Sequence, residues 1–375
     1  MAFALTGARV FDGADMLDGM TVIIDGSFIG DVLPASHLPR DIEVYDLKGG
    51  ILTAGFIDVQ VNGGGGALMN DRPTIETVRR IAEAHRKFGT TGLLPTVITD
   101  DQKVIDRAVA AVQDAISNHV PGILGIHLEG PFLDVIRKGA HSANYIRAMT
   151  QSDVQRIAAI ACGSVMLTLA PNKVSTRFIS ELAQRGVLIS LGHAEATVAE
   201  VQQALEAGAR AFTHIYNAMS QLNGREPGMV GACLADHESF CGVIVDGLHV
   251  AEIALKVLFA AKANNRIMLI TDAMPSAAGG PETFELQGRT ARRVGHGLQL
   301  DDGTLAGSIV TMDEAVRRSV QLGVSLENAL RMASLVPAQF LRRENKLGRV
   351  AKGFVASMVH LSDDLHVEKT WIDGQ

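Results

Sequence analysis

Four residues with metal-binding or acid–base side chains each come directly after a short apolar run of the sequence. They are Glu129 in GIHLEGPF, His193 in LISLGHAEAT, His214 in AFTHIYNAM and Asp272 in IMLITDAM. Two imidazoles and one carboxylate are a common ligand set for a catalytic divalent metal, and they leave one tetrahedral position open for water. Asp272 is then the natural acid/base for that water. We therefore predict that Glu129, His193 and His214 bind a metal ion and that Asp272 transfers protons.

Each of these residues taken alone has a simpler interpretation. A single His at a strand end is more often structural, a Glu before Gly-Pro can cap a turn, and an Asp after a strand often caps the next helix. The joint placement of all four after predicted strands favours the metal site over these separate roles.

The elements between these residues predict how the four side chains meet. Eight short apolar runs stand out, at residues 56–61, 92–98, 123–128, 165–169, 187–191, 210–213, 242–245 and 267–271. Most are separated by amphipathic helical segments, and two more helices are expected near 311–322 and 325–342. Near-continuous apolar strands that alternate with helices indicate a parallel sheet, and eight such units predict a closed, TIM-like (β/α)₈ barrel. The active site of such a barrel lies at the C-terminal ends of the strands, where these side chains would converge.

The two ends of the chain have a different sequence pattern from the middle. Residues 1–53 and 344–375 contain β-branched runs that are cut by Gly and Asp-Gly turns. We expect these two segments to pair in one small β-sandwich domain, with the barrel formed by residues 54–343. The run Gly63–Gly66 lacks both the GxxxxGK[ST] and the GxGxxG spacing, so we interpret it as a flexible turn and not as a phosphate loop.

Composition limits the partners of this α/β protein. The 375 residues are 47% hydrophobic and carry a formal net charge of −7, which argues against nucleic acid or an anionic membrane as the main partner. No run approaches ~18 apolar residues, and the N-terminus lacks the pattern of a signal peptide. Three cysteines, Cys162, Cys233 and Cys241, do not make a disulfide framework. We expect a cytoplasmic protein.

Nine motifs along the chain have a recognisable order. They read AGFIDVQVNGGGG, GIHLEGPF, RKGAH, SLGHA, THIYNAM, GREPG, VDGLHV, ITDAM and LAGSIVTM. In this order the chain resembles the N-acetylglucosamine-6-phosphate deacetylases of the amidohydrolase superfamily, from about Leu5 to Asp373. The resemblance implies hydrolysis of N-acetylglucosamine 6-phosphate to glucosamine 6-phosphate and acetate.

The resemblance also implies roles for individual residues. Glu129, His193 and His214 would bind the metal, Asp272 would be the acid/base, and His141 would help to polarise the acetyl carbonyl. The sugar site would be lined by Ala140, His141, Asn217, Ala218, Leu305, Ala306 and Gly307. Arg225 and His249 would bind the 6-phosphate, with Asp246, Gly247 and Leu248 shaping the loop. Similar enzymes are usually homodimers, so Arg225 is expected either in its own site or in that of the neighbouring subunit.

The first predicted strand bears on the number of metal ions. Most amidohydrolases carry His-x-His at its end and bind a second metal there, whereas this chain has Gln60-Val61-Asn62. Amide side chains are poor zinc ligands compared with imidazole. We therefore expect one divalent ion per subunit, with Zn²⁺ first and Fe²⁺, Co²⁺ or Mn²⁺ as competitors. At the tail, Ala356-Ser357 stands where the family often has Ala-Asp, far from the predicted chemistry.

Two other functions are alternatives. One is a different amidohydrolase, such as a dihydroorotase, cytosine deaminase or N-acyl-amino-acid hydrolase, against which GREPG and DGLH argue. The other is an inactive barrel with a binding or assembly role, against which the intact set of four chemical side chains argues. Turnover with and without the 6-phosphate tests the first, and metal content with acetate release tests the second.

Overall fold

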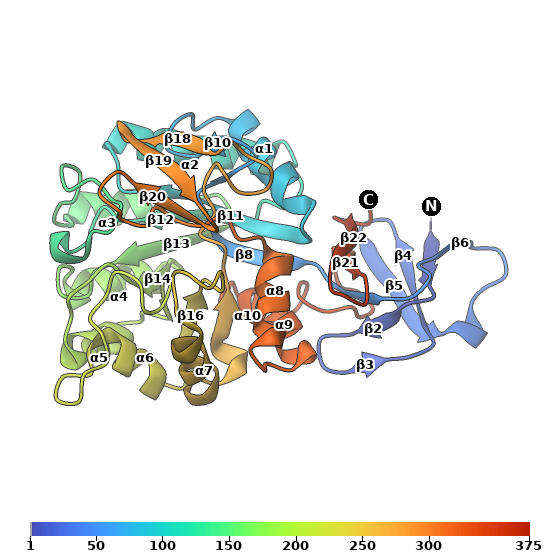
Figure 1. Ribbon diagram of the computed structural model, residues 1–375. Coiled ribbons are helices and arrows are strands. Elements are labelled where there is room, and N and C mark those ends of the chain that lie inside the picture. The colour runs from blue at the N-terminus through green and yellow to red at the C-terminus, as the bar shows by residue number, and fades with distance from the viewer. Residues whose placement is uncertain (1) are drawn as a thin grey trace.

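The computed structural model describes residues 2–375, and its largest element is an eight-stranded parallel sheet that curves into a barrel (Figure 1). The strands are β8 (Phe56–Val61), β11 (Thr90–Ile98), β12 (Gly125–Glu129), β13 (Ser164–Leu169), β14 (Leu188–Leu191), β15 (Ala211–Phe212), β16 (Phe240–Val243) and β17 (Ile267–Leu269). They neighbour one another in chain order. The predicted TIM-like barrel is confirmed, and each of its strands overlaps one of the eight apolar runs.

Helices follow most of the strands and cover the outside of the barrel (Figure 1). They are α1 (Ile75–Arg86), α2 (Gln102–Ser117), α3 (Gln151–Ala158), α4 (Thr176–Gln184), α5 (Val198–Glu206), α6 (Gly228–Ala235), α7 (Glu252–Ala261) and α8 (Met312–Gln321). Short 3₁₀ helices lie at η1 (Ala35–His37), η2 (Val135–Arg137) and η3 (Asn264–Arg266). Local sequence sets the starts of several helices: Thr150 with Asp153, and Thr197 with Glu200, form capping boxes at α3 and α5.

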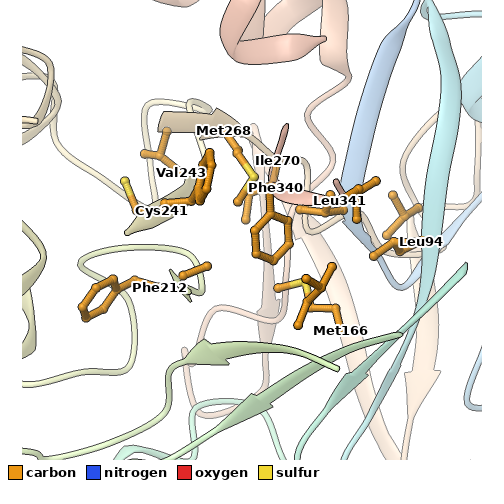
Figure 2. Packing of buried hydrophobic residues seen from close by; sticks show 14 of the residues in the cluster. Leu94, Met166, Phe212, Cys241, Val243, Met268, Ile270, Phe340 and Leu341 are labelled. Atoms are coloured by element: carbon orange, nitrogen blue, oxygen red, sulfur yellow. The ribbon is translucent and has the colours of Figure 1, made fainter. Parts of the chain in front are cut away.

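The prediction of a single helix over 325–342 is wrong. The segment forms α9 (Leu326–Ala333) and α10 (Leu335–Phe340), with Ser334 between them at φ −133° and ψ −72°. Pro337 explains the break, because it has no N–H to donate to the carbonyl four residues earlier and its ring clashes there. The end of α10 carries Phe340 and Leu341 into the core, where Phe340 lies near Met166 and Ile270 (Figure 2).

The barrel closes between its first and last strands, β8 and β17, through a short seam. One isolated parallel bridge joins Val61 to Ala273. Asp272 N donates to Gln60 O at 3.0 Å, and Asn62 N donates to Ala273 O at 3.0 Å. These bonds place the residues at the end of the first strand opposite Asp272.

The two ends of the chain form two further sheets beside the barrel, at the right of Figure 1. One has the order β5-β4-β1-β6 and the other the order β22-β21-β7-β2-β3. Their strands are β1 (Phe3–Thr6), β2 (Arg9–Phe11), β3 (Met16–Leu17), β4 (Met20–Asp25), β5 (Phe28–Pro34), β6 (Glu43–Asp46), β7 (Ile51–Ala54), β21 (Met358–Leu361) and β22 (Val367–Trp371). β21 pairs antiparallel with β7, so the expected pairing of the two termini is confirmed.

A three-stranded antiparallel sheet follows β17 and was not anticipated from the sequence. It consists of β18 (Thr283–Leu286), β19 (Arg289–Val294) and β20 (Gly297–Leu300). Its apolar face packs on Leu68, Ile98 and Met274 at the C-terminal end of the barrel. We call residues 283–300 the cap sheet.

The glycine run after the first strand is the turn of a small hairpin. β9 (Gly63–Gly64) pairs with β10 (Ala67–Leu68), and Gly65 and Gly66 turn the chain at φ 57° and 83°. Within residues 2–375, no helix is both long and apolar enough to cross a membrane.

Candidate active site

Glu129 lies at the centre of the predicted metal site. Its Oε1 is 3.1 Å from His214 Nε2 and 3.3 Å from His193 Nε2, and the two Nε2 atoms are 3.0 Å apart. All three side chains are buried. The structure thus brings together the three predicted metal ligands, which come from the ends of β12, β14 and β15.

This geometry fits a divalent metal. Ligand atoms that bind one tetrahedral zinc at ~2.0–2.2 Å lie about 3.3 Å from one another, close to the separations seen here. Arg137 O lies 2.9 Å from His193 Nδ1. Because a carbonyl can only accept, Nδ1 carries the proton and Nε2 presents its lone pair to the site. Burial opposes ionisation of Glu129, but the close contacts of its carboxylate with the His193 and His214 imidazoles outweigh burial and lower its pKa well below the usual range.

Three of the strand-end residues adopt an unusual backbone conformation. His193, His214 and Asp272 have φ values of 50°, 31° and 49°, in the left-handed region that non-glycine residues rarely occupy. Such conformations cost on the order of 1–3 kcal/mol each and cluster at functional sites. The turn at each strand end therefore aims the side chain over the barrel mouth at the expense of local stability.

Asp272 is buried against the end of the first strand. Its Oδ1 accepts hydrogen bonds from Asn62 Nδ2 at 2.6 Å and Gln60 Nε2 at 3.2 Å, and Gln60 Nε2 also lies 3.1 Å from Glu129 Oε1. Burial, reinforced by the negative charge of Glu129, raises the pKa of Asp272 to about 6. A carboxylate in this range can accept a proton near neutral pH and return it within one turnover.

Asp58 supports Asp272 from below. Its Oδ2 accepts a 2.5 Å hydrogen bond from Thr271 Oγ1, and its carboxyl group also accepts from the backbone N–H groups of Thr271 and Gln60. Burial raises the pKa of Asp58 to about 7. Asp58 thus ties the first strand to the residue that precedes Asp272.

His141 comes from the loop after β12 and faces the same centre. Its Nε2 lies 4.0 Å from Glu129 Oε2, and its ring packs edge-on against His193. Its Nδ1 lies 2.9 Å from the hydroxyl of Thr99. Burial, with the neighbouring His193, lowers the pKa of His141 well below its usual range, so the imidazole is neutral.

These groups open into a cavity of about 360 Å³ at the C-terminal end of the barrel. Of the residues expected from the sequence, it is lined by Glu129, Ala140, His141, His193, His214, Asn217, Ala218, His249, Asp272, Leu305 and Gly307. Further lining residues were not named from the sequence: Ile98, Ile136, Arg137, Gly139, Ile244, Met274 and Thr304. The available signal was the motifs themselves: Arg137, Gly139 and Met274 lie within RKGAH and ITDAM, and Ile136, Ile244 and Thr304 each directly precede a motif.

Five expected binding residues do not line this cavity among the described residues 2–375. They are Arg225, Asp246, Gly247, Leu248 and Ala306. Arg225 is exposed on the loop before α6. Ala306 is buried beneath the cap sheet.

Asp246 acts through its neighbour His249. Its Oδ2 lies 2.6 Å from His249 Nδ1, and its Oδ1 accepts from the N–H groups of Leu248 and His249. Burial opposes ionisation of Asp246, but the His249 contact outweighs it and lowers the pKa. Asp246 therefore fixes the loop and the ring that do reach the cavity.

A buried polar chain lies beneath the metal ligands and was missed by the sequence reasoning. His127 Nδ1 is 3.2 Å from Thr96 Oγ1, and His127 Nε2 is 2.8 Å from Thr168 Oγ1. The chain continues from Thr168 to Thr213 at 2.7 Å and from Thr213 to Ser190 at 2.6 Å. Burial lowers the pKa of His127 to about 4. Because strand residues alternate, His127 shares the inward face with Glu129, and that spacing was the available signal.

Comparison with known proteins identifies the family of this chain. The sequence pattern described as "Amidohydrolase family" matches residues 51–375, and that described as "NagA composite domain" matches residues 2–52. The N-acetylgalactosamine-6-phosphate deacetylase of Shewanella sp. (strain ANA-3) is 46% identical over 98% of this chain and 94% of the relative. The N-acetylglucosamine-6-phosphate deacetylase of Haemophilus influenzae is 33% identical over 100% of this chain and 99% of the relative.

A solved structure shares both parts of the fold. The crystal structure of N-acetylglucosamine-6-phosphate deacetylase from Pasteurella multocida superimposes with a TM-score of 0.97 and 34% identity. The match covers 100% of this chain and 99% of the other.

Proposed function

The chain belongs to the amidohydrolase family, among the N-acetylglucosamine-6-phosphate deacetylases, and we propose that it hydrolyses the acetamide of N-acetylglucosamine 6-phosphate. The products are glucosamine 6-phosphate and acetate. The observation that carries the proposal is the meeting of three metal-ligand side chains, Asp272 and His141 in one cavity whose wall also contains His249.

A single divalent ion held by Glu129, His193 and His214, with Zn²⁺ first among the candidates, would supply Lewis acidity and a water of lowered pKa. Asp272 accepts the proton as the water oxygen bonds to the acetyl carbon. Asn62 and Gln60 occupy Oδ1 of Asp272, which leaves Oδ2 for this transfer. Asp272 then delivers its proton to the amide nitrogen as the C–N bond breaks, because an amine leaves readily only when protonated.

His141 is the donor for the negative charge that develops on the carbonyl oxygen. Its Nε2 edge faces the ligand cluster, and the ring is neutral, so the interaction is a hydrogen bond from an N–H group. A preorganised donor in a buried site stabilises the transition state without reorganisation. Asn217, Ala218, Leu305 and Gly307 also line the cavity, and the sugar ring fits among them.

We propose that the 6-phosphate is bound by His249 and by Arg225 of a second copy of the chain in a homodimer. Arg225 is exposed and does not line its own cavity among residues 2–375. Apolar side chains are exposed on the neighbouring elements: Leu222 at 53%, Leu248 at 48% and, on α7, Ile253 at 79%. Large apolar side chains that remain exposed can be buried by a protein partner. A second copy seated on these residues would cover them and carry its own Arg225 toward His249.

The galactose epimer is a second candidate substrate. A relative named for N-acetylgalactosamine 6-phosphate is 46% identical to this chain, compared with 33% for the Haemophilus relative named for the glucose epimer. The two sugars differ at C4, away from the acetamide and the phosphate. The same residues therefore perform the chemistry on either, and the lining of the sugar site decides between them.

The test is acetate release by the purified protein from both phosphorylated sugars and from both unphosphorylated sugars, with elemental analysis of the same sample. We expect about one divalent metal per chain and a far higher kcat/KM for a phosphorylated sugar. Equal rates with and without phosphate would restore the alternative of another amidohydrolase. Bound metal without acetate release from any of the four would favour an inactive barrel.

A further inference from the structure

In its neutral form, the imidazole of His141 carries a single N–H proton, and the position of that proton decides what the residue can do. A neutral imidazole carries a proton on either Nδ1 or Nε2, so one nitrogen donates a hydrogen bond and the other accepts. The nitrogen that faces the metal ligands is Nε2, 4.0 Å from Glu129 Oε2. In the proposed reaction this nitrogen must carry the proton, because it donates to the acetyl carbonyl.

The partner of the other nitrogen is the hydroxyl of Thr99. Thr99 follows the end of β11, is fully buried, and places Oγ1 2.9 Å from His141 Nδ1. The same Oγ1 lies 3.2 Å from the backbone carbonyl of Glu129. A hydroxyl has one proton to donate, so it can serve only one of these two acceptors at a time. The shorter contact is the one to the imidazole.

Both members of this pair are held in place from the cap sheet. Gln287 Nε2, just beyond β18, donates to Thr99 O at 2.6 Å, and the guanidinium of Arg289 on β19 donates to Ala140 O next to His141. Below Thr99, a Cβ at Gly130 would lie 2.1 Å from Oγ1, so only glycine fits there. The hydroxyl is therefore confined between the ring and the carbonyl.

We infer that Thr99 is a positioning residue whose hydroxyl donates to His141 Nδ1 and thereby keeps the ring proton on Nε2, where it can bond to the acyl oxygen of the substrate. This inference rests on the proposed function of His141. The rival arrangement has His141 Nδ1 donating to Thr99, which passes its own proton to Glu129 O. That arrangement leaves a lone pair on Nε2, which repels a carbonyl oxygen.

The test compares two variants of Thr99. Thr99→Val keeps the shape of the side chain but has no proton to donate, whereas Thr99→Ser keeps the hydroxyl. We expect Thr99→Val to lower kcat by about 10- to 100-fold, the scale for losing an orienting partner or an oxyanion donor, with KM and metal content little changed. Thr99→Ser should restore most of the rate.

Thr90→Val is the matched control. Thr90 begins β11, the strand that Thr99 follows, and it is buried, but its hydroxyl has no hydrogen-bond partner among residues 2–375. Loss of that hydroxyl should leave kcat within about twofold of wild type, because no hydrogen bond at the reacting centre changes.

Nitrogen-15 NMR of histidine-labelled wild-type protein shows directly which ring nitrogen of His141 is protonated. The His141 signals are assigned by their loss in a His141→Gln variant. Protonation of Nε2 is expected, and protonation of Nδ1 would overturn the inference even if Thr99→Val failed to fold. A Thr99→Val enzyme with wild-type kcat, or with a loss that Thr99→Ser shares fully, would overturn it as well. If wild type released no acetate from either phosphorylated sugar, the proposed function would fail, and the spectrum would still decide which nitrogen is protonated.

Discussion

Asn62 donates a 2.6 Å hydrogen bond from Nδ2 to Oδ1 of Asp272 across the seam where the first and last strands of the barrel meet. Gln60 adds a second amide donor to the same oxygen at 3.2 Å. In place of a His-x-His pair, the first strand of this chain ends in two amides that hydrogen-bond to Asp272, the proposed acid/base. The amides that stand in place of the His pair thus hold Asp272 Oδ1 in a fixed position.

Replacing Asn62 by Leu should lower kcat by about 10-fold, because Asp272 loses the donor that fixes Oδ1. The Asn62 hydrogen bond lowers the pKa of Asp272, so its removal raises that pKa. Asp272 must be ionised to accept a proton, and the acidic limb of the pH–rate profile should therefore move to higher pH. Steady-state rates from pH 5 to 8 measure both effects; an unchanged profile would remove Asn62 from the mechanism.

Asp272→Asn should retain the fold and the metal but lose turnover by at least ~10²-fold, the scale of general acid/base catalysis. The reason is that the amide can neither accept the proton from water nor return it to the leaving amine. Acetate release, circular dichroism and metal analysis on one preparation give the three readouts. Near-normal activity would contradict the assigned role.

Purified protein should contain about one tightly bound divalent ion per chain, because Glu129, His193 and His214 converge while the first strand offers only amides. His193→Ala and His214→Ala should each lose both metal and activity. Elemental analysis after dialysis is the measurement. Two tight equivalents, with Gln60 or Asn62 among the ligands, would show that the second site persists.

Arg225→Ala should lower kcat/KM for the phosphorylated sugar by ~10-fold or more and scarcely change the slow hydrolysis of the unphosphorylated sugar. The phosphate is remote from the amide, and its binding energy positions the acetyl group. Equal losses on both sugars would mean that Arg225 supports the fold or the dimer instead.

Mixing subunits tells whether Arg225 acts across the interface. A dimer of one Arg225→Ala and one Asp272→Asn subunit has one site with intact Asp272, and it receives intact Arg225 only from the partner. After random exchange, roughly a quarter of all sites should regain full activity. If subunit exchange is shown to have occurred but activity does not recover, Arg225 acts in the site of its own subunit.

Asp153→Asn should destabilise the protein at neutral pH by about 1–2 kcal/mol, allowing for solvent around the half-exposed Arg147. Burial opposes ionisation of Asp153, but the two 2.7 Å bonds from Arg147 outweigh it and lower its pKa from 3.8 to about 2. A lowered carboxyl pKa stabilises the fold above about pH 4, and this contribution is lost as pH falls toward 2. Urea unfolding at pH 7 and pH 3, with the exposed Asp114→Asn as control, should show a difference that shrinks in acid.

The sequence was sufficient to predict the barrel and the cluster of Glu129, His193 and His214, because both leave local signals. Buried parallel strands appear as apolar runs. Glu129 ends one such strand, and His193, His214 and Asp272 each lie within three residues of the end of another. The resemblance then added His141 and His249, which also line the cavity.

The remaining features depend on contacts between distant segments. Thr99 looks like an ordinary strand-end residue until the fold places it against His141, 42 positions further along. The cap sheet carries polar and basic residues such as Arg292 and Arg293, so its strands lack a continuous apolar run. The break between α9 and α10 did have a local signal in Pro337, which the helical periodicity around it outweighed.

The narrow seam between β8 and β17 also has a dynamic consequence. A single bridge and a few bonds hold it, so amide hydrogens there should exchange with solvent sooner than those in the long ladder between β12 and β13. Opening the seam would separate Asn62 and Gln60 from Asp272 and break the Gln60 contact with Glu129. The three proposed metal ligands would stay together, because they lie on other strands. Opening of the seam would then interrupt the proton transfer proposed for Asp272 while the proposed metal ligands stay in place. The lifetime of the closed seam would therefore limit how long the site stays in its active arrangement.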